Sequence, residues 1–156
     1  MSIRSTVKAV IIVDKKILLN RCNDPVYGEY YSLPGGGQNQ YESFYEAVKR
    51  ECLEETGYSV RPVRFAALCE TIFMNEEQRE NDPNYTHRIY HVFLCELCSE
   101  DRVVPSEKDS MQVSCEWVDI DSISKETRLF PKAVCDNIDI ILNSSTPIYL
   151  GTDYKD

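Results

Sequence analysis

The chain has 156 residues, of which 42% are hydrophobic, and this length and composition predict one globular domain with its own core. Its 26 Asp and Glu residues against 17 Lys and Arg give a net charge of -9, which disfavours binding to a nucleic-acid backbone. A phosphorylated small molecule is not excluded, because a divalent cation can lie between clustered carboxylates and a phosphate.

The cysteines and the N-terminus favour a cytoplasmic protein. The 7 cysteines are an odd number scattered through apparent core elements, which is typical of reduced thiols. Cys95 and Cys98 form a C-x-x-C pair in a predicted strand, where residues three apart point to opposite faces, so we predict no metal or redox site there. The apolar run Ala9–Val13 is too short for a signal peptide or a membrane span.

Most of the chain is predicted to form β-strands. These segments are rich in β-branched and aliphatic residues, and the first two are separated by the turn Asp14–Lys15. Pro34–Gly37 is expected to interrupt any regular structure. The predicted strands are Val7–Val13, Lys16–Arg21, Tyr30–Leu33, Val60–Phe73, Ile89–Leu97 and Ser114–Val118.

Two helices are predicted. The clearer one is Ser43–Gly57, because Ser43 and Glu46 have the spacing of a capping box and Gly57 suits the left-handed position after a helix. The second is Pro131–Leu142, in which the proline is tolerated because it lies in the first turn.

The order of these elements indicates the fold class. Several strands with one strong internal helix, and another helix near the C-terminus, predict a mixed α/β sheet packed between helices. We expect residues 1–142 to form the single domain and the tail Asn143–Asp156 to be loosely held.

The helix Ser43–Gly57 carries its glutamates on its apolar side. At about 100° per residue, Glu51 and Glu55 fall within about 60° of Phe44, and Glu54 lies just outside this sector. A solvated surface helix would instead place its acidic residues opposite the apolar side. No lysine is found among the neighbours of this acidic stripe.

An acidic stripe of this kind is costly without a positive partner. Like charges four residues apart cost about 0.2–0.5 kcal/mol even when exposed, and partial burial raises the pKa of each carboxyl. A hard divalent cation such as Mg²⁺ compensates for this charge, and Arg50 is placed to orient Glu54. From the helix alone, a face of salt bridges without a ligand is an equally good interpretation.

The segment Gly36–Tyr58 has a distinctive spacing of charged and glycine residues. Gly36 is followed after five residues by Glu42, and after seven more by the run R-E-C-L-E-E-T-G-Y, which begins at Arg50. This pattern resembles the Nudix box, G-x5-E-x7-R-E-U-x-E-E-x-G-U with U apolar, at every charged and glycine position. Cys52 and Tyr58 stand where a branched aliphatic residue is usual, whereas Leu33–Gly37 and Glu116–Val118 also resemble the family.

The resemblance implies a Nudix-type α/β/α sandwich with a mixed β-sheet between helices, and the activity of a metal-dependent pyrophosphohydrolase. Mg²⁺ or Mn²⁺ would be bound by Glu51, Glu54 and Glu55, with the carbonyl of Gly35 as a further ligand. The residues that would support this site structurally are Gly36, Glu42, Arg50 and Gly57.

The resemblance leaves the general base open. In this family the base is either a glutamate of the box, here Glu54 or Glu55, or a carboxylate from the loop before the late strand. That loop, Val104–Val113, holds Glu107 and Asp109, and we prefer Glu107.

Three residues outside the box are candidate substrate contacts. Arg21 precedes the first loop, and Glu70 lies in the strand that follows the box helix. Arg79 belongs to the hydrophilic stretch Asn75–Thr86, which is long enough to form a loop on the substrate side.

The function we favour is hydrolysis of the pyrophosphate linkage of a nucleoside diphosphate joined to another moiety, as in ADP-ribose or a nucleotide sugar. One alternative is a pyrophosphohydrolase of non-canonical or oxidised nucleoside triphosphates. The other is a non-catalytic sensor that binds such a nucleotide. We expect a small-molecule nucleotide as partner, with no nucleic acid and no membrane, and a homodimer is compatible with the resemblance.

Overall fold

The strands belong to one mixed sheet, which we describe from a computed structural model covering residues 2–108 and 110–156. Its order is β8-β3-β2-β1-β6-β5-β9, with β4 beside β1 and β7 beside β2. Three pairs are parallel, namely β1 with β6, β5 with β9 and β3 with β8. The strands are β1 Arg4–Val13, β2 Lys16–Asp24, β3 Gly28–Ser32, β4 Gly35–Gly37, β5 Tyr58–Phe73, β6 His87–Arg102, β7 Gln112–Asp119, β8 Leu129–Phe130 and β9 Ile148–Lys155.

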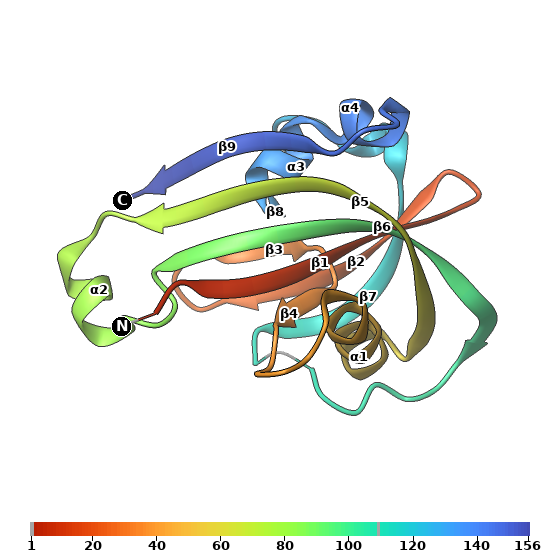
Figure 1. Cartoon of the computed structure of the whole chain (residues 1–156), viewed down its shortest axis with the longest axis horizontal. Helices are drawn as coiled ribbons and strands as arrows, with labels where there is room; N and C mark the ends of the chain where they lie inside the picture. Colours follow the sequence, from red (N-terminus) through yellow and green to blue (C-terminus); the bar gives the residue numbers. More distant parts are fainter. Residues whose placement is uncertain (1, 109) are drawn as a thin grey trace.

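Helices cover both sides of this sheet (Figure 1). Helix α1 (Phe44–Thr56) packs on one side, and the short helices α3 (Lys132–Asp136) and α4 (Ile138–Asn143) pack on the other. The apolar residues of β1 alternate between the two layers, because Val7 belongs to the core cluster with α1 and Val10 to the cluster with α3 and α4. The predicted α/β/α arrangement with a mixed central sheet is therefore confirmed.

Helix α1 begins and ends as its sequence predicts. Ser43 Oγ accepts a hydrogen bond from the Glu46 backbone N–H (3.2 Å), and Glu46 Oε2 accepts one from the Ser43 backbone N–H (2.8 Å). Gly57 has φ 77° and donates its N–H to the Leu53 carbonyl. A Cβ on Gly57 would lie 1.9 Å from the Val103 carbonyl oxygen, so this position requires glycine for both its conformation and its space.

The glycine run after Pro34 differs from its prediction. Gly35–Gly37 does not interrupt regular structure but forms β4, which pairs antiparallel with β1. A Cβ on Gly35 would lie 2.0 Å from the Val7 carbonyl oxygen. The missing side chains therefore permit an unusually close approach of two strands, which outweighs the low strand propensity of glycine.

The helices outside the box also differ from their predictions. The segment predicted as one helix is divided into α3 and α4 at Asn137, whose φ of -124° and ψ of 20° are not helical. The Asn137 side chain donates to the Ala133 carbonyl, a local bond that competes with helix continuation. The hydrophilic stretch contains the unpredicted helix α2 (Glu76–Asn81), capped by Asn75. No helix in the described residues is long and apolar enough to cross a membrane.

The C-terminal tail forms an edge strand, so the prediction of a loosely held tail is wrong for residues 148–155. Strand β9 pairs parallel with β5 over most of its length. The ammonium group of Lys155 lies 3.9 Å from the centroid of the Phe130 ring, which adds a cation–π contact to the backbone pairing. The partner of this strand is remote in sequence, and a local pattern does not reveal it.

Gly57→Ala is expected to destabilise the fold more than Gly151→Ala. Both glycines have positive φ, 77° and 87°, so both substitutions carry a conformational cost of about 1–2 kcal/mol. A Cβ at position 151 meets nothing within 4 Å, whereas at position 57 it collides with Val103, which adds about 1–3 kcal/mol. Urea denaturation of both variants measures the difference, and equal losses would contradict the packing role of Gly57.

Candidate active site

The C-terminal half of α1 carries the predicted carboxylates toward β4. Glu55 is buried, and Glu51 and Glu54 are half-buried. A Cβ on Gly36 would lie 2.5 Å from Glu51 Oε1, so the Glu51 carboxylate lies directly against the backbone of β4. The acidic stripe of the helix therefore faces the glycine strand and not the solvent.

Arg50 links the loop before α1 to these carboxylates. Its guanidinium donates from Nε to Glu42 Oε1 (2.6 Å) and from Nη2 to Glu42 Oε2 (3.0 Å). The same Nη2 donates to the Gly37 carbonyl (3.0 Å). Its Nη1 donates to Glu51 Oε1 (2.9 Å) and Glu54 Oε2 (3.2 Å). The hydrogen bond with Arg50 lowers the pKa of Glu42, so Glu42 stays ionised and braces the loop against the helix.

Glu55 occupies the most enclosed position of the site. Its Oε2 accepts hydrogen bonds from the Gly35 backbone N–H and from Asn20 Nδ2, both at 2.9 Å. Burial nevertheless raises the pKa of Glu55 to about 7, and burial also raises the pKa of Glu51. The predicted effect of partial burial on these two glutamates therefore appears in the structure.

Two buried amides that sequence reasoning did not identify hold Glu55 in place. Gln112 Nε2 donates to Asn20 Oδ1 (3.3 Å) and to the Glu55 backbone carbonyl (3.0 Å). Within the described residues Gln112 Oε1 has no hydrogen-bond partner. Asn20 could have been identified from the sequence, because it directly follows the apolar run Ile17–Leu19. A polar side chain in a buried strand needs a hydrogen-bond partner.

A lysine lies next to the acidic stripe, contrary to the prediction that it has none. Lys8 Nζ donates to the Leu33 carbonyl at 3.0 Å and lies 3.4 Å from the Gly35 carbonyl. Its charge lowers the pKa of Glu51 and Glu55, against the larger effect of burial. The prediction failed because Lys8 comes from β1, which pairs with β4 and is remote from the helix in sequence.

The loop that holds Glu107 crosses the end of α1. The Glu107 backbone N–H donates to the Glu54 carbonyl at 3.1 Å, which brings the loop to the same end of the helix as the glutamates. The Glu107 side chain is exposed. Asp109, the other acidic residue considered in this loop, lies outside the described residues.

The three predicted substrate contacts are not brought to the box glutamates. Arg21 follows Asn20 on β2 and therefore points to the opposite face, where it forms ion pairs with Glu29 and Glu116. Glu70 accepts hydrogen bonds from Tyr149 and Thr152 of β9. Arg79 donates from Nε to the Phe73 carbonyl and so holds the turn after β5. The alternation of side chains along β2 explains the position of Arg21, and the pairing of β5 with β9, which the sequence does not reveal, explains that of Glu70.

The chain was compared with models of known protein families and with solved structures. The family model for the NUDIX domain matches residues 3–135. The chain belongs to the Nudix family. The resemblance inferred from the box is thus confirmed, and with it the class of enzyme, a pyrophosphohydrolase.

Solved structures resemble the chain over most of its length. A NUDIX hydrolase from Nitrosomonas europaea is 28% identical, with a TM-score of 0.62 over 78% of this chain and 76% of that one. An ADP-ribose pyrophosphatase from Streptococcus suis is 22% identical, with a TM-score of 0.62 over 95% and 99%. A MutT protein from Methanosarcina mazei Go1 is 23% identical, with a TM-score of 0.66 over 90% and 96%. The last two likenesses bear on the fold alone.

The donor set of the Nudix box fits a hard divalent cation. The candidate ligands are three carboxylates and the carbonyl of Gly35, all of them oxygen donors of the kind that Mg²⁺ and Mn²⁺ prefer. Within residues 2–108 and 110–156, no three acidic, cysteine or histidine side chains converge on one point. Glu51 and Glu54 are both paired with Nη1 of Arg50.

Glu55→Gln is expected to stabilise the metal-free protein at pH 8 but not at pH 5. The folded-state pKa of about 7 exceeds the ordinary value of 4.5, so the stability from neutral Glu55 is present below pH 4.5 and is lost as pH rises through 7. Glutamine removes this loss, and each kcal/mol recovered raises Tm by about 2–4 °C in a chain of this size.

Thermal unfolding with excess chelator at both pH values measures this effect. Glu100→Gln is the matched control, because Glu100 is exposed on β6 and its substitution should leave Tm unchanged at either pH. An equal increase in Tm at pH 5 and pH 8 for Glu55→Gln would show that ionisation of Glu55 does not destabilise the folded protein.

Proposed function

We propose that this Nudix enzyme is a metal-dependent hydrolase that cleaves the pyrophosphate linkage of a nucleoside diphosphate joined to another moiety, such as ribose or a sugar. The observation that carries the proposal is the position of the buried acidic stripe. Glu51 lies against β4 and Glu55 accepts from the Gly35 N–H, so carboxylates and the candidate carbonyl ligand lie on one side of α1.

The chain's own residues would hold Mg²⁺ or Mn²⁺ through Glu51, Glu54, Glu55 and the Gly35 carbonyl. When bound, such an ion neutralises charge on the pyrophosphate and lowers the pKa of an attacking water. Arg50 keeps Glu51 and Glu54 oriented on the helix through its paired hydrogen bonds. Asn20 donates to the Glu55 carboxylate, and Gln112 in turn donates to Asn20.

Glu107 is the general base that we propose. Its backbone is tied to the Glu54 carbonyl while its side chain is exposed, so it can accept a proton from water near the box without breaking a contact. Glu55 is less suited to this role, because its Oε2 already accepts two hydrogen bonds.

The substrate is proposed to be a small nucleotide in a reducing, cytoplasmic setting. The net charge of -9 disfavours a nucleic-acid polyanion, whereas a single pyrophosphate needs only local neutralisation. None of the 7 cysteines forms a disulfide bond in the described residues, which agrees with a reducing compartment. A nucleoside triphosphate is the second candidate substrate, because a cation held by the same carboxylates would also neutralise its phosphates.

Turnover is expected to depend strictly on a divalent cation, because carboxylates alone repel a pyrophosphate. ADP-ribose, a nucleotide sugar and a nucleoside triphosphate are each incubated with Mg²⁺, Mn²⁺ or excess chelator, and the products are separated by chromatography. We expect two monophosphates from the first two compounds, and no reaction in chelator. Full activity in chelator would refute the metal mechanism, and pyrophosphate released only from the triphosphate would favour the second candidate.

Glu54→Gln and Glu55→Gln are expected to lower kcat by orders of magnitude, because each keeps the side-chain volume but removes ligand charge. Glu107→Gln should lower kcat by about 10²–10⁴-fold, the usual contribution of a general base. Steady-state kinetics with Mg²⁺ measure these effects, with circular dichroism to verify folding and Glu100→Gln as the control. Near-normal turnover in the two box variants would contradict the proposed roles of Glu54 and Glu55, whereas no turnover of any substrate by the unchanged protein would favour the non-catalytic sensor.

A further inference from the structure

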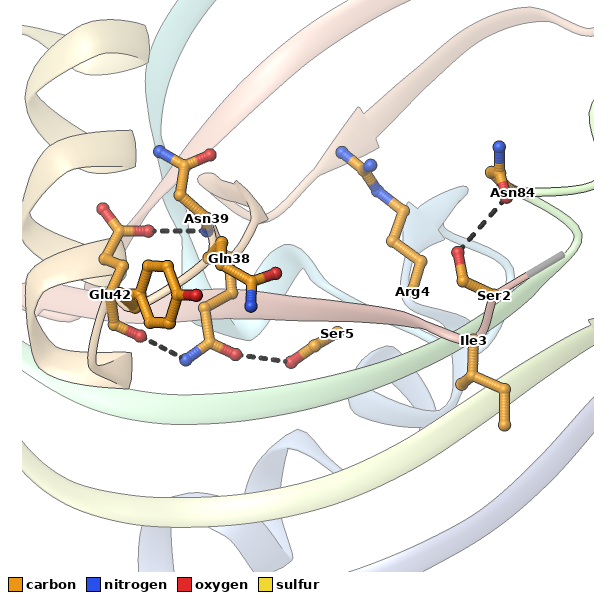
Figure 2. Close-up of a pocket in the computed structure, with 10 residues that line it drawn as sticks. Ser2, Ile3, Arg4, Ser5, Gln38, Asn39, Glu42 and Asn84 are labelled. Atoms are coloured by element: carbon orange, nitrogen blue, oxygen red, sulfur yellow. Dashed lines mark hydrogen bonds between the residues drawn. The ribbon is translucent and has the colours of Figure 1, made fainter.

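A hollow of about 480 Å³ lies beside the Nudix box at the N-terminal end of β1. The loop between β4 and α1 forms one wall, and the start of the chain with the segment before β6 forms the other (Figure 2). Its size is within the range of small-molecule sites. The lining residues are Ser2–Ser5, Gln38–Glu42 and Asn84.

Arg4 supplies this hollow with an uncommitted positive charge. Its guanidinium lies 4.5 Å from the centroid of the Tyr85 ring, and no carboxylate within the described residues forms an ion pair with it. The one acidic residue of the lining, Glu42, is occupied by Arg50 and by the Asn39 backbone N–H. In a chain of net charge -9, a guanidinium with free donors in a hollow favours an anionic ligand.

The walls of the hollow are polar and partly fixed. Gln38 accepts from Ser5 Oγ (2.9 Å) and donates to the Glu42 carbonyl (2.6 Å), so its amide has a set orientation. On the other wall Asn84 accepts from Ser2 Oγ (3.2 Å), and Figure 2 shows the Arg4 side chain between the two walls. Amide and hydroxyl groups of this kind suit a ligand with many hydroxyl groups better than an apolar one.

Tyr41 adds an aromatic ring at the rim. It is 98% exposed and has φ 65°, a conformation that costs a residue with a side chain about 1–2 kcal/mol. Such strain is commonly retained where a ligand uses the residue. An exposed tyrosine ring offers a flat surface for a sugar or a base.

The hollow is close enough to the candidate metal ligands to share one substrate with them. Arg4 lies against Gly37, where a Cβ would be 2.5 Å from its Nη2. Gly37 is two residues along β4 from Gly35, a separation of about 7 Å. A pyrophosphate that has one protein group bound to each of its two phosphates spans a comparable length. One phosphate can therefore lie near Gly35 and the other near Arg4.

We propose that this hollow binds the sugar-phosphate half of the substrate, with Arg4 on its phosphate and the amides of Gln38, Asn39 and Asn84 on the sugar hydroxyls. The source of the ligand rests on the proposed function, because a sugar phosphate is a product of cleaving a nucleoside diphosphate sugar. The binding site itself requires neither metal nor turnover, and it can therefore be tested separately.

The test uses the full chain labelled with ¹⁵N, in excess chelator, titrated with ribose 5-phosphate, ribose and inorganic phosphate. We expect ribose 5-phosphate to shift the backbone amides of 2–5, 38–42 and 84, and to bind more tightly than either fragment. Arg4→Gln should weaken binding on the order of tenfold, the usual value of a charge-assisted contact, and Arg4→Lys should restore part of it. The unshifted amides report whether each variant is folded.

Arg61→Gln is the matched control, because Arg61 is an exposed arginine of β5 paired with Glu96 and outside the hollow. Its affinity for ribose 5-phosphate should equal that of the unchanged protein. The proposal is overturned if the shifts lie elsewhere, if inorganic phosphate binds as tightly as ribose 5-phosphate, or if Arg4→Gln binds as well as Arg61→Gln. Loss of hydrolysis in the substrate panel, with this binding intact, would instead count against the proposed function alone.

Discussion

The arrangement of the site depends on the hydrogen bonds that the Arg50 guanidinium donates. This group joins the Gly37 carbonyl and Glu42, both before the helix, to Glu51 and Glu54 on the helix itself. A planar group with five donors can satisfy these acceptors together, which a lysine at this position could not do. The loop, the glycine strand and the acidic face of α1 are thereby held as one unit.

Burial and hydrogen bonding act in opposite directions on the Glu55 carboxyl. Three elements besides its own helix enclose it, because β4, β2 and β7 supply Gly35, Asn20 and Gln112. The hydrogen bonds favour the charged carboxylate, but they do not offset burial, which raises the pKa of Glu55 to about 7. A carboxyl with a pKa raised in this way is typical of functional sites, which agrees with the proposed role of Glu55.

The parts of the structure that could be predicted are those whose signal is local. The capping box at Ser43, the left-handed Gly57 and the acidic stripe all lie within one helix, where spacing alone determines what shares a face. Strand β4, strand β9 and the position of Lys8 depend on pairing between remote segments, which no local pattern contains. The ion pairs of Arg21 with Glu29 and Glu116 likewise join strands that are separate in sequence.

The position of Lys8 would affect how strongly the proposed site binds a metal ion. The Lys8 ammonium group lies 3.4 Å from the Gly35 carbonyl, so an ion bound to this carbonyl would have a second positive charge close by. Two positive charges at this separation repel each other, and the ammonium group cannot diffuse away because its strand holds it in place. Lys8 would therefore weaken the binding of the ion alone, and it would attract the phosphates of a substrate, whose negative charge offsets both cations.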